Sequence, residues 1–395
     1  MLLTSAPPSA LRAVGCRIWL PIRNGASPWH RWFSTSPTHR AAKHVISFGE
    51  SSTPELSKLL DTFRYYIVLP TYLAPEQRKK IYKPKLKDYL QNDPVTMEID
   101  GETYKFRHIR MAADLPNTRR LVKQATNAMT TKQDFQNLPA LLEGCERANR
   151  KLSTAIWTAM LRRAAMHKSL PVIMDCIKAV KRTGFKLDRS EVINELLVWL
   201  QIPAIESGWD EDKTRVAFKQ VRLVLNLMES DENHLPRKKD ELAFPFYRDP
   251  QVLAHRLHMA AARAVHHKKG EDVDGQVAKY AQELVTLWPE GAGLLDLQPA
   301  ESYKNREKMW YLINRNQYLW HASPVLNGLT LAAQVVDPAL AMQLQNRADS
   351  VESEVKAALA SDKRKRGGRG EEMYNSIFNP QASQEEPAAA AEETA

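Results

Sequence analysis

Two short segments 35 residues apart constrain the fold of this chain more than any other feature of its sequence. They are Arg147-Ala-Asn-Arg-Lys-Leu-Ser153 and Arg182-Thr-Gly-Phe-Lys-Leu-Asp188. Each one follows an apolar segment with helical periodicity and precedes another such segment. The intervening residues predict one helix over 154–166, a second over 170–183, and a bend at Gly184. A period of this length predicts paired helices that bury their apolar faces by stacking on the next pair.

The unit at residues 153–187 resembles the pentatricopeptide repeat, and the likeness extends over roughly residues 134–200. Repeats of that family bind single-stranded RNA through small polar residues at fixed positions on the first helix. The corresponding positions here are Trp157 or Thr158 and Val192 or Ile193. Three of these four side chains are bulky and apolar, so they cannot hydrogen-bond the edge of a base. The resemblance therefore implies a docking surface more than a surface that reads an RNA sequence.

The chain beyond Pro116 is predicted to be almost entirely helical. Residues 116–200 are interpreted as the pentatricopeptide-like repeats, and residues 201–360 as a degenerate helical domain. The period is lost after Gln201, where residues 202–213 are predicted to form a loop that contains Pro, Gly and acidic residues. Further helices are predicted near residues 215–229, 249–268, 301–320 and 338–360. Residues 361–395 are predicted to be a charged, disordered tail.

Residues 34–115 are predicted to form a basic N-terminal extension with one helix and one β-hairpin. Pro54 is well placed to open the helix, and the apolar residues after it recur every three or four positions as far as Leu69. Between residues 93 and 110 the pattern alternates apolar and polar side chains around Asp100-Gly101, a dipeptide that suits a tight turn. The predicted fold class is therefore mainly α, a helical-hairpin array preceded by this small extension.

The first 49 residues contain no Asp or Glu, while six Arg and Lys residues lie among them. This composition is typical of a mitochondrial transit peptide. Arg31-Trp-Phe-Ser34 resembles the motif in which cleavage occurs shortly after an arginine, so residues 1–33 are predicted to be a presequence. The predicted destination is the mitochondrial matrix. A basic tail that binds nucleic acid is the alternative interpretation of the same residues.

Groups of Lys and Arg along the chain are candidate contacts for RNA phosphates, and the formal net charge of +10 favours a polyanionic partner. The densest group is interleaved with Tyr82 and Tyr89, whose rings could stack on bases. Other groups lie beside the predicted hairpin, just after it, and near the C-terminus. A solvated basic face and an acidic protein neighbour are the alternatives. The candidate residues are Arg78, Lys79, Lys80, Lys83, Lys85, Lys87, Lys105, Arg107, Arg110, Arg119, Arg120, Lys363, Arg364, Lys365 and Arg366.

Little in the sequence suggests catalysis or a bound cofactor. Phosphate-loop, dinucleotide-binding, zinc-protease and serine-hydrolase motifs are absent, so we expect neither enzymatic activity nor a small-molecule substrate. His255, His258, His266 and His267 suggest a metal site, but the local sequence offers no further ligands, and we expect none. The aromatic residues between 310 and 320 are predicted to pack in the core. No apolar run reaches the ~18 residues that a membrane-spanning helix needs.

The segment Phe63-Arg-Tyr-Tyr-Ile-Val-Leu-Pro-Thr-Tyr-Leu-Ala-Pro75 and the basic run after it resemble proteins of fungal mitochondrial ribosomes, with the large subunit favoured. The resemblance implies a non-catalytic structural component whose partners are mitochondrial ribosomal RNA and neighbouring mitochondrial ribosomal proteins. Two alternatives stay open at this point. One is a pentatricopeptide-like translation activator or RNA-processing factor, and the other is an assembly factor for a respiratory complex.

Overall fold

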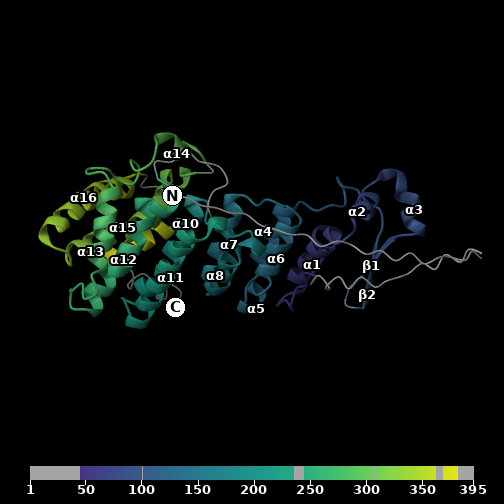
Figure 1. Cartoon of the computed structure of the whole chain (residues 1–395), viewed down its shortest axis with the longest axis horizontal. Coiled ribbons are helices and arrows are strands. Elements are labelled where there is room, and N and C mark those ends of the chain that lie inside the picture. Colours follow the sequence, from purple (N-terminus) through teal and green to yellow (C-terminus); the bar gives the residue numbers. More distant parts are fainter. Residues whose placement is uncertain (1–44, 100, 235–243, 307, 362–367, 381–395) are drawn as a thin grey trace, which may run out of the picture. The chain divides into compact units, whose positions relative to one another are not determined.

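The computed structural model describes residues 45–99, 101–234, 244–306, 308–361 and 368–380. The chain divides into two units, residues 1–44 and 45–395, and all described residues belong to the second. The predicted presequence and the basic run at 363–366 lie outside the described residues. The described part is mainly helical, and its only sheet is a two-stranded antiparallel one (Figure 1). The predicted fold class, mainly α with a small β-hairpin, is confirmed.

The first helix begins where the sequence predicts it. In α1 (Pro54–Phe63) the proline occupies the first turn, and the side chain of Thr53 caps the helix by accepting a hydrogen bond from the backbone of Leu56. A π-helical stretch (Arg64–Val68) and a 3-10 turn (Leu69–Thr71) continue it. The predicted helix is therefore confirmed, and the helical path extends slightly beyond Pro70.

Short elements complete the extension around a small separate core. They are α2 (Pro75–Ile81), a 3-10 turn (Pro84–Leu86), α3 (Lys87–Asn92), β1 (Val95–Ile99) and β2 (Glu102–Phe106). The two strands pair with Val95 opposite Phe106, as the hairpin prediction requires, and Gly101 has the positive φ of 84° that a tight turn needs. The core beneath them consists of Leu69, Leu73, Ile81, Ile99, Phe106 and Ile109.

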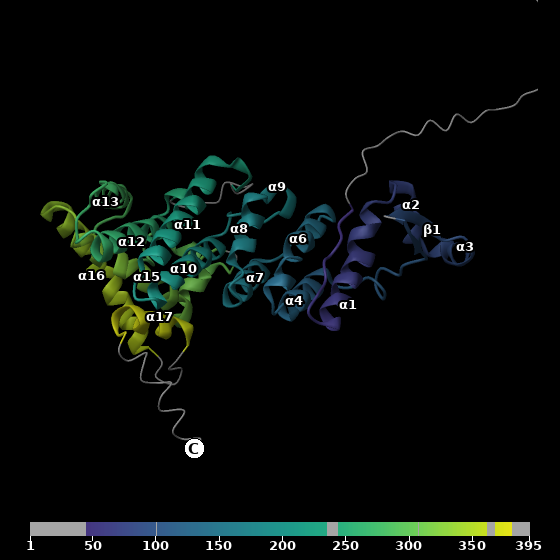
Figure 2. The ribbon, with the colours of Figure 1, turned by 90° about the horizontal axis from the view of Figure 1, so that it is seen from below.

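Helices after residue 116 stack in sequence order (Figures 1 and 2). The first members of this series are α4 (Thr118–Ala128), α5 (Lys132–Phe135), α6 (Leu138–Arg147), α7 (Thr154–Met166), α8 (Leu170–Lys178), α9 (Val180–Thr183), α10 (Ser190–Glu206) and α11 (Glu211–Ser230). α1 packs on α4, α4 on α7, and α7 on α10. The bend predicted at Gly184 is confirmed, because this residue caps α9 in the left-handed conformation.

The remaining helices pack around α15. They are α12 (Pro250–His267), α13 (Gln276–Leu287), α14 (Ala300–Lys304), α15 (Arg315–Ala333), α16 (Pro338–Ala360) and α17 (Arg369–Phe378), with 3-10 turns at Glu232–His234, Phe246–Arg248 and Trp310–Ile313. α15 contacts α12, α16 and α17, and α17 also contacts α10 (Figure 2). No described helix is both long and apolar enough to cross a bilayer.

Three predictions about secondary structure are wrong. The loop predicted at 202–213 is shorter, because α10 continues through Pro203 to Glu206, held by the buried side chains of Ile202 and Ile205. The helix predicted at 301–320 is broken, since α15 begins only after Asn314, whose side chain accepts hydrogen bonds from two backbone amides. The predicted tail at 361–395 contains α17, which buries Met373 against α10 and α15.

Candidate nucleic-acid interface

The densest basic run is presented by α2, the 3-10 turn after it, and α3. Ile81 and Leu90 are fully buried and fix these helices to the extension, so the polar positions between them face solvent. All six predicted cations of this run are exposed. They are Arg78, Lys79, Lys80, Lys83, Lys85 and Lys87.

The two tyrosines of this run differ in their surroundings. Tyr82 is half-buried against the small core, and burial raises its pKa, while the nearby Arg150 and Arg78 oppose that rise. Tyr89 is 55% exposed, and its hydroxyl donates a 2.7 Å hydrogen bond to Asp93. Tyr89 is therefore the ring of the two that a base could stack on without a rearrangement of the core.

The end of the hairpin is fastened to α2. The backbone N–H of Ile109 donates to the carbonyl of Ile81 over 2.8 Å, and Nδ1 of His108 lies 3.1 Å from the same carbonyl oxygen. This contact brings the second predicted group of cations next to the first, with Lys105 and Arg107 exposed. A hollow of about 350 Å³ joins the groups, and it is lined by Lys87, Gln91, Arg107, His108 and Arg110.

Arg110 differs from the other cations of the hairpin because a carboxylate already neutralises it. Its Nη2 lies 2.8 Å from Oδ1 of Asp114, and its Nε also hydrogen-bonds that carboxylate. The hydrogen bonds from Arg110 hold the pKa of Asp114 below its usual range. Arg110 is exposed, but the carboxylate of Asp114 already neutralises part of its charge.

The third predicted group, Arg119 and Arg120, is exposed on the first turn of α4. Nε of Arg119 donates a 3.2 Å hydrogen bond to the carbonyl of Lys151. Together with Arg150 and Lys151 it lines a further hollow of about 470 Å³. The structure therefore places Arg119 beside Arg150 and Lys151 of the α6–α7 loop, two cations that were not predicted from the sequence.

The cations of the extension are largely free of intramolecular ion pairs. Among the described residues, no carboxylate lies within ion-pair distance of Arg78, Lys79, Lys80, Lys83, Lys85, Lys87, Lys105 or Arg107. Arg369, which follows the basic run at 363–366 in the sequence, is engaged inside the protein, where it pairs with the buried Glu195 at 2.9 Å.

Other candidate sites from the sequence are part of the core. His255 and His258 are buried on either side of Gln201, with His258 Nδ1 2.7 Å from its Oε1, and burial lowers the pKa of His258 to about 3. Among the described residues no group of His, Cys, Asp and Glu is arranged to hold a metal ion. The aromatic residues Tyr311, Tyr318 and Trp320 are buried as predicted, whereas Trp310 is 40% exposed.

The positions that contact bases in pentatricopeptide repeats are not accessible to RNA in this protein. Trp157, Thr158, Val192 and Ile193 are all buried, so none of them presents a polar group to a base. This agrees with the expectation that these positions do not read an RNA sequence, and it leaves the docking role of the hairpins a prediction. A helical protein whose exposed cations have no carboxylate partner among the described residues presents the kind of surface that suits a polyanionic partner.

Comparison with known proteins identifies the assembly. Residues 31–376 match the family described as mitochondrial ribosomal protein mS27. The chain is also 40% identical over 391 residues to the small ribosomal subunit protein mS27 of Neurospora crassa, an alignment that covers 94% of this chain and 98% of that protein. The chain therefore belongs to the mS27 family of mitochondrial ribosomal proteins.

Family membership settles several predictions. The resemblance to a mitochondrial ribosomal protein is confirmed, and a member of this family is a structural, non-catalytic component of the ribosome. The preference for the large subunit is wrong, because the relative is a small-subunit protein. The sequence contains no short motif specific to either subunit, so its residues alone could not distinguish a large-subunit protein from a small-subunit protein. The translation-activator and assembly-factor alternatives lose their support.

Proposed function

We propose that this protein is a component of the small subunit of the mitochondrial ribosome in the matrix, where its N-terminal extension binds ribosomal RNA and its helical hairpins bind neighbouring ribosomal proteins. The observation that carries the proposal is the set of exposed cations on α2, α3 and the hairpin that have no carboxylate partner among the described residues. Family membership provides the setting, and the acid-free N-terminal segment supports delivery to the matrix.

The physical basis of RNA binding is the release of counterions. Each lysine or arginine that meets a phosphate displaces a condensed cation from the nucleic acid, and this entropy gain drives association. A cation already paired with a carboxylate gains less, because the internal pair must first be broken. The unpaired cations of the extension meet this requirement better than the paired ones of the helical body.

The pentatricopeptide-like hairpins serve as the protein-binding part of the proposal. Their base-reading positions are buried, which leaves the outer surfaces of the stacked helices for contacts with other proteins. Helical arrays of this kind provide extended faces for such contacts.

The test is a charge reversal in the densest run, followed by sedimentation of mitochondrial extract. The variant changes four exposed lysines to Glu, namely Lys79, Lys80, Lys83 and Lys85. The matched control changes four exposed lysines of the helical body to Glu, namely Lys213, Lys219, Lys268 and Lys279. We expect the variant to leave the small subunit at a lower salt concentration than the wild type, while the control stays bound. Equal retention of the variant and the wild type across the salt series would refute RNA binding by this segment.

A further inference from the structure

We propose that the loops which lead into α7 and α10, together with the first turn of α4, form a second site for the RNA phosphate backbone that continues from the extension. The inference rests on the proposed function and deepens it. The cations of this loop groove are Arg119, Arg150, Lys151, Lys186 and Arg189.

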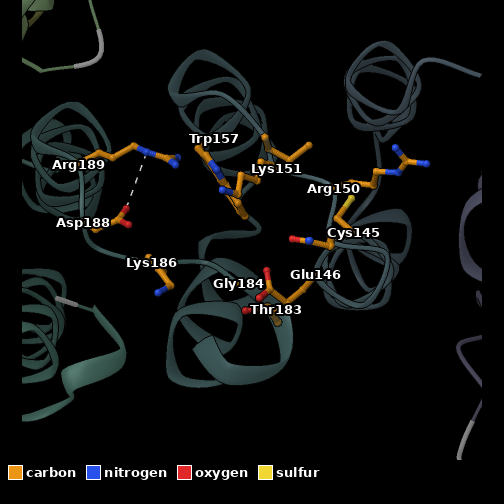
Figure 3. Close-up of a pocket in the computed structure, with 12 residues that line it drawn as sticks. Cys145, Glu146, Arg150, Lys151, Trp157, Thr183, Gly184, Lys186, Asp188 and Arg189 are labelled. Atoms are coloured by element: carbon orange, nitrogen blue, oxygen red, sulfur yellow. Dashed lines mark ion pairs between the residues drawn. The ribbon is translucent and has the colours of Figure 1, made fainter. Parts of the chain in front are cut away.

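Two adjoining hollows make up the loop groove. The first, of about 470 Å³, lies between the start of α4 and the α6–α7 loop. The second, of about 250 Å³, extends from the end of α6 to the start of α10 (Figure 3). Asn149, Arg150 and Lys151 line both hollows, so the two share one wall. In Figure 3, Arg150 and Arg189 stand at opposite sides of the second hollow, with Lys151 between them.

The charge of the loop groove is unbalanced. Its lining contains five cations but only two carboxylates, Glu146 and Asp188. Asp188 is engaged with Arg189 at 3.8 Å. Among the described residues no ion pair to a carboxylate involves Arg150, Lys151 or Lys186. Positive charge without an internal partner is the feature that a polyanion needs.

The 35-residue period of the sequence places a lysine in each of the two loops that line the groove. Lys151 and Lys186 occupy the same position in the two segments that match at an offset of 35 residues. The residues two positions earlier, Asn149 and Gly184, both adopt a left-handed conformation, with φ of 52° and 68°. The two loops therefore share a left-handed turn one repeat apart, and each places its lysine at the groove, with Lys151 exposed and Lys186 partly buried. A partner whose charge recurs along a chain fits this pattern better than a globular acidic protein.

The first arginine of each segment differs from the lysine because it is engaged within the protein. Arg147 stacks 3.8 Å from the centre of the Tyr72 ring and hydrogen-bonds Thr71. Arg182, its counterpart, lies 3.4 Å from the carboxylate of Glu143. The fold thus uses the first cation of each segment for packing or pairing, and leaves the lysine at the groove.

The loop groove lies beside the extension. Arg147, the last residue of α6, places its guanidinium 3.8 Å from the centre of the Tyr72 ring and hydrogen-bonds Thr71, so the α6–α7 loop starts against the extension. Trp157 lines the second hollow and is held in place by the ring of Phe185, 4.8 Å away. A strand of RNA bound at the extension could therefore continue to the loop groove.

The experiment compares the salt dependence of RNA binding by full-length mature variants, with labelled single-stranded oligouridylate as the probe. The double variant is Lys151→Gln with Lys186→Gln. Two phosphate contacts fewer should lower the slope of log binding constant against log salt by about 1.4, since each contact contributes about 0.7. The control, Lys168→Gln with Lys213→Gln, removes the same charge from another hollow, and should change the slope far less. Lys151→Arg with Lys186→Arg should restore the wild-type slope.

The outcomes separate this inference from the proposed function. If the double variant keeps the wild-type slope, or falls no further than its control, the groove does not bind RNA. The four-lysine variant of the extension then still tests the proposed function by itself. If the slope is unchanged but crosslinks to neighbouring ribosomal proteins are lost, the groove binds an acidic protein and the inference is overturned.

Discussion

The N-terminal extension and the helical body carry charge in opposite ways. In the extension, lysines project from short helices over a core of six apolar side chains, and most have no carboxylate beside them. In the body, cations surround a carboxylate that is completely buried. Glu195 of α10 lies 2.8 Å from Arg162 and 2.9 Å from Arg369, and the indole N–H of Trp199 also donates to it.

In the buried cluster, the negative charge of Glu195 is balanced by the positive charges of Arg162 and Arg369. Burial raises the pKa of Glu195, but the neighbouring cations outweigh burial and hold it below the usual value. His321, 3.7 Å away, contributes less than the arginines at neutral pH, because burial lowers its own pKa to about 4. The charges of this cluster have partners inside the protein, whereas the cations of the extension have no carboxylate partner among the described residues and are available to an external one.

The largest effect is expected from breaking the balanced cluster. Glu195→Gln removes the buried carboxylate that Arg162 and Arg369 share and leaves Arg162 only its longer 3.8 Å contact with Glu191. Removing one partner of a buried pair costs roughly 3–5 kcal/mol, and the partial exposure of both arginines places the expected loss near the lower end of that range. Urea unfolding measures this loss. Asp212→Asn is the control, because it removes a fully exposed pair with Arg215 and should leave the free energy of unfolding unchanged. Equal unfolding midpoints for Glu195→Gln and the wild type would contradict the argument.

A smaller effect is expected at the junction of the two regions. The buried carboxylate of Asp134 accepts hydrogen bonds from the backbone and hydroxyl of Ser52, at 2.8 and 2.7 Å, and from the backbone of Thr131. Burial tends to raise the pKa of Asp134, but these hydrogen bonds outweigh it and hold the value well below 3.8. Asp134→Ala should cost about 2 kcal/mol, measured by urea unfolding at neutral pH.

The pH dependence of the same carboxylate has a definite sign. Because its folded pKa is depressed, its stabilisation is fully present above the unfolded pKa of about 3.9 and is lost as the pH falls below that value. The destabilisation by Asp134→Ala should therefore shrink between about pH 4 and pH 2. A difference that stays constant over this range would show that the carboxylate acts by packing alone.

The smallest effect on stability is expected in the extension. Charge reversal of four lysines of α2 and the turn after it breaks no ion pair among the described residues. The free energy of unfolding, measured by thermal denaturation, should therefore change by no more than about 0.5 kcal/mol. The four are Lys79, Lys80, Lys83 and Lys85. A loss of several kcal/mol would mean that these lysines stabilise the fold, and the contrast between the two regions would disappear.

Local patterns in the sequence were sufficient to predict many elements. The helices at 154–166 and 338–360 have the predicted bounds, because apolar spacing and Pro338 are signals within a few residues. The left-handed bend at Gly184 was predicted from an equally local signal. The hairpin around Gly101 was equally local. The exposed cations of α2 and α3 could also be found, since Ile81 and Leu90 are the apolar positions that orient those helices.

Features that depend on distant contacts could not be found in this way. α17 is held by packing against α10 and α15, so residues 361–395 alone resemble a charged tail. Arg369 is adjacent to a basic run in sequence, yet its partner is 174 residues earlier. The loop groove was within reach, because the matching segments already contain Lys151 and Lys186, but only the fold shows that these loops lie side by side.

The pairing of Arg369 with Glu195 has a consequence for how the protein matures. Synthesis runs from the N-terminus, so the carboxylate on α10 exists well before the guanidinium on α17 is made. Until then, one of its two arginine neighbours is missing, and the interior of α10 and α15 stays incompletely neutralised. Completion of this cluster thus waits for α17, and a product that terminates before Arg369 lacks one of the two guanidinium groups that lie against Glu195.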